Sequence, residues 1–134
     1  MIQTTLLLIK PNAVKNKHIG DIISIIEKNN FLIKDIKLIQ FDEALINTFY
    51  QEHLGKAFFN ELAKFMQSDI TIALKLEREN AIVELRKING SASIANRDPN
   101  SIRALYADSI TANAVHSSDS ENSAKRELEI IFGM

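Results

Sequence analysis

The segment at residues 70–77, ITIALKLE, places an apolar residue at every second position. In an extended chain successive side chains point to opposite sides, so these apolar residues share one face. They are Ile70, Ile72, Leu74 and Leu76. A strand with one apolar face must bury it against a second layer, which restricts this chain to folds built on a sheet.

Two further segments have the character of strands. Residues 4–9 are leucine-rich and β-branched and stop at a Lys-Pro pair, as in a buried strand. Residues 31–41 alternate around Lys37, with Ile36 and Leu38 on either side. The sequence therefore predicts three strands that are far apart along the chain.

Helices are predicted between and after these strands, from amphipathic spacing and from residues typical of helix ends. They cover residues 21–30, 42–50, 58–66, 81–88 and 120–131. The order of elements predicts an α+β sandwich with helices covering an antiparallel sheet. The βαββαβ arrangement of the ferredoxin-like fold is the natural candidate. It needs a fourth strand, which the sequence does not identify.

Composition narrows the function classes. A chain of 134 residues with 46% hydrophobic residues is expected to form one domain, over residues 1–134. A net charge of -1 gives no electrostatic case for binding nucleic acid or a membrane. The absence of cysteine excludes disulfides and thiol chemistry and is compatible with a reducing compartment. No segment approaches the roughly 20 apolar residues of a membrane span, so we expect a cytoplasmic protein.

The stretch NAVHSSDSEN, residues 113–122, contains the most suggestive histidine, His116. Ser118 and Glu121 have capping-box spacing, which predicts a helix starting at this point, and helix N-termini favour anions. The Ser118 hydroxyl could hold one imidazole nitrogen, and a neutral imidazole is a competent nucleophile. From these residues alone, His116 is either a nucleophile or an ordinary turn histidine.

Other candidate groups are cationic or aromatic. Lys10 ends the first predicted strand, and Arg86 and Arg103 offer planar forks suited to phosphate. Each alone is more often a solvated surface residue. The neighbouring rings of Phe58 and Phe59 cannot both face the core from one helix. The chain has no glycine-rich phosphate motif, so any phosphate site must be built from side chains.

The segment at residues 91–112 has no clear periodicity and is rich in Ser, Asn and Asp. Structureless loops of this length are uncommon unless they are functional or disordered. This one carries Arg97 and Arg103 and leads to His116, so we favour a functional loop. The histidines His18 and His53 are interpreted as surface residues.

Six sequence blocks, in this order and spacing, resemble the nucleoside diphosphate kinase family over nearly the full chain. They are IKPNAV, Tyr50, AFFNELAKFM, the helix with Arg86, SIRA around Arg103, and NAVHSSDSENSAKRE. The resemblance implies a ferredoxin-like fold, homo-oligomers (tetramers or hexamers) and ping-pong transfer of the γ-phosphate of a nucleoside triphosphate to a nucleoside diphosphate. It also implies Mg²⁺, held mainly through the nucleotide phosphates.

The resemblance also implies roles for individual residues. His116 would be the phosphorylated nucleophile, supported by Tyr50, Ser118 and Glu127. The nucleotide-binding residues would be Lys10, Phe58, Arg86, Arg103 and Asn113. Of these, Phe58 would stack on the base.

The chain departs from the family pattern at several positions. It has Asn12 where the family usually has Asp, Ser117 where it usually has Gly, and Ala92 where it has a phosphate-contacting Thr. A serine at 117 would be strained if that position needs a positive φ. The lost hydroxyl at 92 predicts weaker nucleotide binding with retained chemistry. The alternative function is a divergent nucleotide-binding oligomeric module with weak or no transfer activity.

Overall fold

The computed structural model describes residues 1–133, and position 134 lies outside the described residues. Its elements, in chain order, are β1 (Ile2–Ile9), α1 (Pro11–Lys15), α2 (Ile19–Lys28), β2 (Leu32–Ile39), α3 (Glu43–Phe49), η1 (Gln51–His53), α4 (Phe59–Gln67), β3 (Thr71–Glu79), α5 (Ala81–Asn89), η2 (Ile94–Asn96), α6 (Ile102–Tyr106), β4 (Val115–Ser117) and α7 (Glu121–Phe132). All predicted strands and helices are present, with ends that differ by a few residues.

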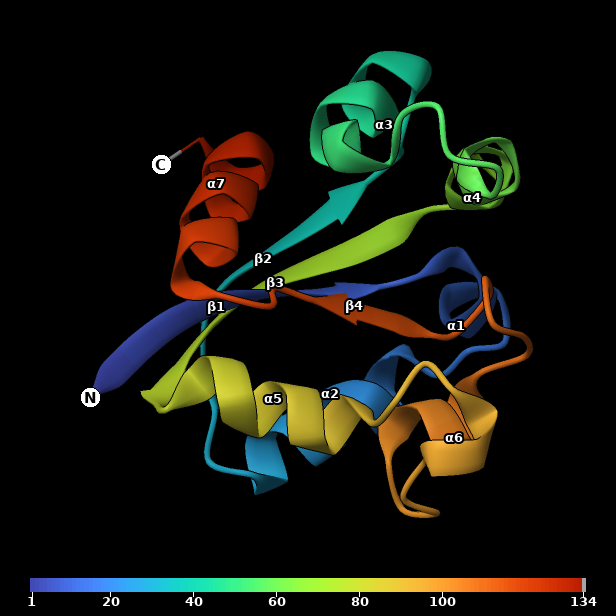
Figure 1. Ribbon diagram of the computed structural model, residues 1–134. Coiled ribbons are helices and arrows are strands. Elements are labelled where there is room, and N and C mark those ends of the chain that lie inside the picture. Colours follow the sequence, from blue (N-terminus) through green and yellow to red (C-terminus); the bar gives the residue numbers. More distant parts are fainter. Residues whose placement is uncertain (134) are drawn as a thin grey trace.

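The four strands form one sheet in the order β2-β3-β1-β4, and all neighbouring strands are antiparallel. Helices α3 and α7 lie on one face of the sheet, and α2 and α5 lie on the other (Figure 1). This arrangement confirms the predicted ferredoxin-like α+β sandwich. The described part of the chain contains no helix that is long and apolar enough to span a membrane.

The alternation in the third strand decides which core each side chain joins. The even-numbered residues Ile72, Leu74 and Leu76 pack with α2 and α5, as the sequence predicted. Ala73 faces the other way and packs with Leu6 and Leu8 in the second core, against α3, α4 and α7. The sheet therefore separates two apolar layers, and both layers reach the end of β1.

The fourth strand, which the sequence did not identify, is β4. Its three residues pair with the end of β1, with His116 opposite Leu8 and Val115 opposite Ile9. A strand of three residues is too short to show an alternation of apolar and polar residues, and the residues that follow it are polar. Its conformation is fixed by pairing with a distant segment.

The segment at residues 91–112 is more ordered than predicted, since it holds η2 and α6. Ser101 caps α6, because its Oγ accepts a hydrogen bond from the backbone N–H of Ala104 at 3.2 Å. Ile102 is fully buried in the core on the α5 side. The helix was missed because it is only five residues long, too short for a periodic pattern.

The predicted capping box at Ser118 is wrong. Helix α7 begins at Glu121, and Ser120 is its cap, with Oγ accepting from the N–H of Ser123 at 3.0 Å. Ser118 is fully buried and its hydroxyl donates to Glu127 instead. The Ser118 hydroxyl was predicted to bond to the backbone at the start of the helix, but it bonds to the buried Glu127 carboxylate of α7 instead.

Asn89, at the end of α5, is fully buried, and no residue among 1–133 hydrogen-bonds either polar atom of its side chain. Burying an amide without partners costs free energy. We therefore predict that Asn89→Leu, which keeps the branched shape, raises the free energy of unfolding by about 1–3 kcal/mol. Thermal and urea unfolding would measure it. Lower or unchanged stability would mean that Asn89 has a partner that the chain itself does not provide.

Candidate active site

The pairing of β1 with β4 brings together two groups that are far apart in the sequence. Lys10 follows β1, and its backbone N–H donates to the carbonyl of Ala114 at 2.8 Å, just before β4. His116 lies two residues further along, in β4. The end of β1 thus carries the lysine, and the neighbouring strand carries the histidine.

The imidazole of His116 is held by a buried carboxylate. Its Nε2 lies 2.9 Å from Oε1 of Glu127, and the Ser118 hydroxyl donates to the same oxygen at 2.7 Å. Ser118 therefore supports the histidine through Glu127, and not by the direct contact suggested from sequence. A carboxylate can only accept, so Nε2 carries the proton and Nδ1 keeps its lone pair.

Two aromatic rings pack against the other sides of the imidazole. Phe49 and Tyr50 meet it edge-on, with ring centroids 5.3 Å and 6.3 Å away. The Tyr50 hydroxyl is buried and no described residue hydrogen-bonds it. Burial, followed by the nearby Glu127 carboxylate, raises the pKa of Tyr50, so the phenol stays protonated at neutral pH.

His116 opens onto a cavity of about 460 Å³. The cavity is lined by Glu52, His53, Arg86, Gly90, Ser91, Ala92, Arg103, His116, Ser117, Asp119 and Glu127. No described residue hydrogen-bonds Nδ1 of His116, which leaves that nitrogen available. A cavity of this size suits a small-molecule ligand.

Arg103 is anchored by two backbone carbonyls. One terminal nitrogen donates to the carbonyl of Gly90 at 2.7 Å and the other to that of Val115 at 2.8 Å. Gly90 has φ +84°, and a Cβ there would collide with Ser101, so glycine is required. Burial, then Arg86 and Arg97, lower the pKa of Arg103 to about 10, and it stays charged at neutral pH.

Arg86 lies in the last turn of α5, is exposed, and has no hydrogen-bond or ion-pair partner among the described residues. The charge of Arg86 contributes to the lowered pKa of Arg103. The pKa of Asp119 is lowered by a hydrogen bond from Ser123 and also by the charge of Arg86. Arg86 and Arg103 therefore bring two positive charges to one wall of the cavity. An anionic ligand would relieve the repulsion between them.

Lys10 is buried and is not among the residues that line the cavity. Its ammonium donates to Oδ1 of Asn113 at 2.9 Å, and Asn113 is buried as well. Burial and, after it, the charge of Arg103 lower the pKa of Lys10 to about 7. The lysine is thus poised to change its charge near neutral pH.

Phe58, the residue predicted to stack on the base, does not line the cavity but contacts a residue that does. Phe58 is 46% exposed, whereas Phe59 packs against the second core. The Phe58 ring lies 5.3 Å from that of His53, which lines the cavity. Of the two neighbouring rings, Phe58 is the one available to stack on a ligand.

Three cavity residues with ionisable side chains were not assigned from the sequence: Glu52, His53 and Asp119. His53 lies three residues after Tyr50 on the same turn and stacks on it, with ring centroids 6.2 Å apart. That spacing was the available signal, but His53 was interpreted as a surface residue. Glu52 and Asp119 bring the carboxylates that line the cavity to three, with Glu127, beside the two arginines.

Two of the three departures from the family pattern, Ser117 and Ala92, line the cavity. Ser117 belongs to β4 and is not among the residues with positive φ, so the strain considered for it does not arise. Ala92 presents a methyl group where a threonine would offer a hydroxyl. The nearby Ser91 hydroxyl accepts a hydrogen bond from the N–H of Ser93 at 3.0 Å.

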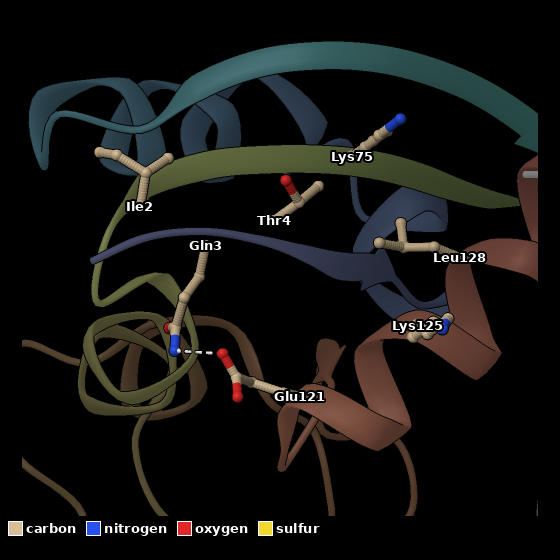
Figure 2. A pocket seen from close by; sticks show the side chains of 7 residues that line it. All are labelled: Ile2, Gln3, Thr4, Lys75, Glu121, Lys125 and Leu128. Atoms are coloured by element: carbon tan, nitrogen blue, oxygen red, sulfur yellow. Dashed lines mark hydrogen bonds between the residues drawn. The ribbon is translucent and has the colours of Figure 1, made fainter.

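A second cavity of about 450 Å³ lies on the free edge of β1 that β4 does not reach. Figure 2 shows Gln3 pointing toward Glu121 of α7, where its amide donates at 3.2 Å, with Ile2, Thr4 and Leu128 around it. No histidine or arginine lines it. The His116 cavity, in contrast, brings two arginines and a histidine backed by a buried carboxylate to one place, an arrangement that suits the transfer of phosphate groups.

Comparison with known proteins agrees with this class. The family model described as nucleoside diphosphate kinase matches residues 3–134. A nucleoside diphosphate kinase of Haemophilus ducreyi is 47% identical over 132 residues, covering 98% of this chain and 96% of the relative. One from Sulfolobus acidocaldarius is 39% identical, covering 98% and 90%. The chain belongs to the nucleoside diphosphate kinase family, and it is an enzyme of the kinase class.

Solved structures show the same fold. The Aquifex aeolicus nucleoside diphosphate kinase superposes with a TM-score of 0.93 at 36% identity, covering 98% of this chain and 96% of that one. The Encephalitozoon cuniculi enzyme superposes with a TM-score of 0.94 at 26% identity, covering 98% and 90%. These relatives favour the kinase over the alternative of an inactive binding module.

Proposed function

We propose that this single-domain protein transfers the γ-phosphate of a nucleoside triphosphate to a nucleoside diphosphate through a phosphohistidine at His116. Family membership supports the overall reaction. The observation that carries the residue assignment is the contact between Nε2 of His116 and Glu127, which leaves Nδ1 without a hydrogen-bond partner among the described residues, in a histidine that lines the cavity. Donor and acceptor use one site in turn, so the kinetics are ping-pong.

In the first half-reaction, the lone pair of Nδ1 attacks the γ-phosphorus. An N–P bond forms, the bond from phosphorus to the bridging oxygen breaks, and the diphosphate leaves with the electron pair. The ring becomes positively charged, and the Glu127 carboxylate stabilises it through the proton on Nε2. In the second half-reaction, a terminal oxygen of the acceptor attacks phosphorus and the N–P bond breaks.

Phosphoryl transfer depends mainly on positioning and charge neutralisation. Arg86, Arg103 and Lys10 supply positive charge, and Asn113 orients the lysine. The exposed ring of Phe58 stacks on the base. Stacking discriminates little between bases, because every base has a π-face.

Mg²⁺ fits this site as a cation that arrives with the nucleotide. Within residues 1–133 no group of three His, Cys, Asp or Glu side chains could hold a metal on its own. Glu52 and Asp119 are the cavity carboxylates that would hold its hydration shell, a common arrangement for Mg²⁺. The bound ion would neutralise charge on the phosphate oxygens.

The proposal is tested by incubating the protein with γ-labelled ATP and Mg²⁺. We expect a phosphoprotein that is labile to acid and stable to base, and whose label moves to any added nucleoside diphosphate. Unlabelled protein that is folded by circular dichroism would overturn the kinase proposal. Label that persists in His116→Ala would overturn only the choice of nucleophile.

We predict that nucleotide binding is coupled to proton uptake by Lys10. Its pKa of about 7 leaves the amine mostly neutral at pH 8, and a bound phosphate raises that pKa. Binding should take up nearly one proton at pH 8, and affinity should fall as pH rises through 7. Calorimetry in buffers of different ionisation enthalpy measures this uptake. Lys10→Arg, which stays charged, should abolish it; equal uptake in both proteins would contradict the prediction.

We also infer a homo-oligomer, because two exposed apolar patches remain. The first lies on the free edge strand β2, where Leu32, Ile36 and Leu38 are exposed. Such an edge is a template for pairing with a second copy. The second patch, on residues 91–112, contains Ile94, Leu105 and Ile110. Two separate patches suit a tetramer or hexamer better than a dimer.

Light scattering after size-exclusion chromatography tests this assembly. We expect the native protein to be larger than a dimer, and Ile36→Lys to reduce its size. A monomeric native protein would contradict the inference.

We further infer a cytoplasmic location, since a chain without cysteine suits a reducing compartment.

A further inference from the structure

The side chain of Asn12, in α1, bonds to the segment between α6 and β4 at three places. Its Nδ2 donates to Oδ2 of Asp108 and to the carbonyl of Ala112, both at 3.0 Å. Its Oδ1 accepts from the backbone N–H of Ala114 at 3.2 Å. Asn12 therefore bonds to the residues on both sides of Asn113.

The backbone that Asn12 holds is strained. Ala114 has φ +77° and is fully buried, a conformation that residues other than glycine rarely adopt. Such strain persists only where surrounding contacts impose it. Here the N–H of Ala114 donates to Asn12, and its carbonyl accepts from the N–H of Lys10 at 2.8 Å.

Asn113, which lies between the two backbone residues that Asn12 holds, is the hydrogen-bond partner of the Lys10 ammonium. The ammonium makes its only hydrogen bond to a described side chain with Oδ1 of Asn113, at 2.9 Å. The place of Asn113 is in turn set by the bonds from Asn12 to its two neighbours. We propose that Asn12 is a positioning residue for the nucleotide site, acting through Asn113 on Lys10, with Asp108 as its anchoring partner. This inference rests on the proposed roles of Lys10 and Asn113.

The chemistry of the contacts requires an amide at position 12. An amide both donates and accepts, whereas a carboxylate only accepts. An aspartate in place of Asn12 would leave the Ala112 carbonyl without this donor and would place a second carboxylate against Asp108. In the native protein the amide is at position 12 and donates to the carboxylate at position 108, so the pair carries one negative charge. Exchanging the two groups would again pair one donor with one acceptor between the two positions.

The experiment compares Asn12→Asp, the exchange variant Asn12→Asp with Asp108→Asn, and the control Asn16→Ala. Asn16 donates to the same Oδ2 of Asp108 at 3.1 Å but does not contact residues 112–114. We expect Asn12→Asp to raise the KM for nucleotide about tenfold or more, with a smaller effect on kcat. The exchange variant should recover most of this loss, although the bond to Ala112 stays absent. The control should stay within about twofold of the native enzyme.

Kinetics are measured well below each variant's melting temperature. A purely stabilising role would lower that temperature and leave KM unchanged, which would overturn the inference. An exchange variant no better than Asn12→Asp would overturn it too. If Asn12→Asp does not fold, the exchange variant must fold and bind nucleotide, and its failure counts against the pairing. Lys10→Ala is assayed in parallel. An unchanged KM in Lys10→Ala refutes the proposed role of Lys10. A raised KM in Lys10→Ala together with a native KM in Asn12→Asp refutes this inference alone.

Discussion

Replacing His116 by alanine is expected to lower kcat for phosphate transfer by about 10³-fold or more, with the fold preserved. The reason is that Nδ1 is the nitrogen left open to the cavity when Glu127 holds Nε2. No other described residue of the cavity combines a neutral lone pair with a buried carboxylate behind it. Without the imidazole, water or the acceptor would have to attack the γ-phosphorus directly.

The measurement is steady-state transfer from ATP to a second nucleoside diphosphate, with single-turnover labelling beside it. His18→Ala is the matched control, because His18 contacts Asp21 and Tyr106 and does not line the cavity. It should keep native kcat. If His116→Ala retains kcat within about tenfold of the native enzyme, the covalent route through this residue is refuted.

The second large effect is expected for Glu127→Gln. The Oε1 atom of Glu127 receives both Nε2 of His116 and the Ser118 hydroxyl, so its charge fixes the imidazole tautomer and stabilises the cationic ring. A glutamine keeps the shape but removes the charge. We expect kcat to fall about 10- to 100-fold, as for supporting partners of reactive histidines in general. KM should change little, because Glu127 does not contact the bases or sugars in this proposal.

Glu129→Gln is the control for this substitution, since Glu129 is exposed on the same helix. Its kcat should be native. Single-turnover labelling of the phosphoenzyme gives an independent readout, and its rate should fall together with kcat. A native kcat and a native labelling rate would show that the Glu127 charge is dispensable.

Parts of the fold with a local signal were predictable from the sequence. The alternation at residues 70–77 correctly predicted β3 and the face it buries. The helix predicted over residues 81–88 is α5, which ends at Asn89, just before Gly90 with φ +84°. The helix predicted over residues 42–50 is α3, which Asp42 caps. Each signal lies within one or two turns of the element it describes.

Features set by distant contacts were not predictable in this way. β4 has three residues and exists through its pairing with β1. The cap of α7 moved from Ser118 to Ser120, because Glu127 binds the Ser118 hydroxyl inside the protein. His53 was missed because its place in the cavity follows from its packing on Tyr50.

The sequence by itself determined the chemical inventory of this protein: one histidine in a distinctive block, a lysine after a buried strand, two arginines and the family that their order and spacing indicate. Only the tertiary structure decided which imidazole nitrogen has a partner, that Lys10 is buried with a pKa of about 7, and that Asn12 bonds to both neighbours of Asn113. The physical reason is the register between β1 and β4. It brings segments from opposite ends of the chain into hydrogen-bonding distance, and no local preference along the sequence encodes those distances.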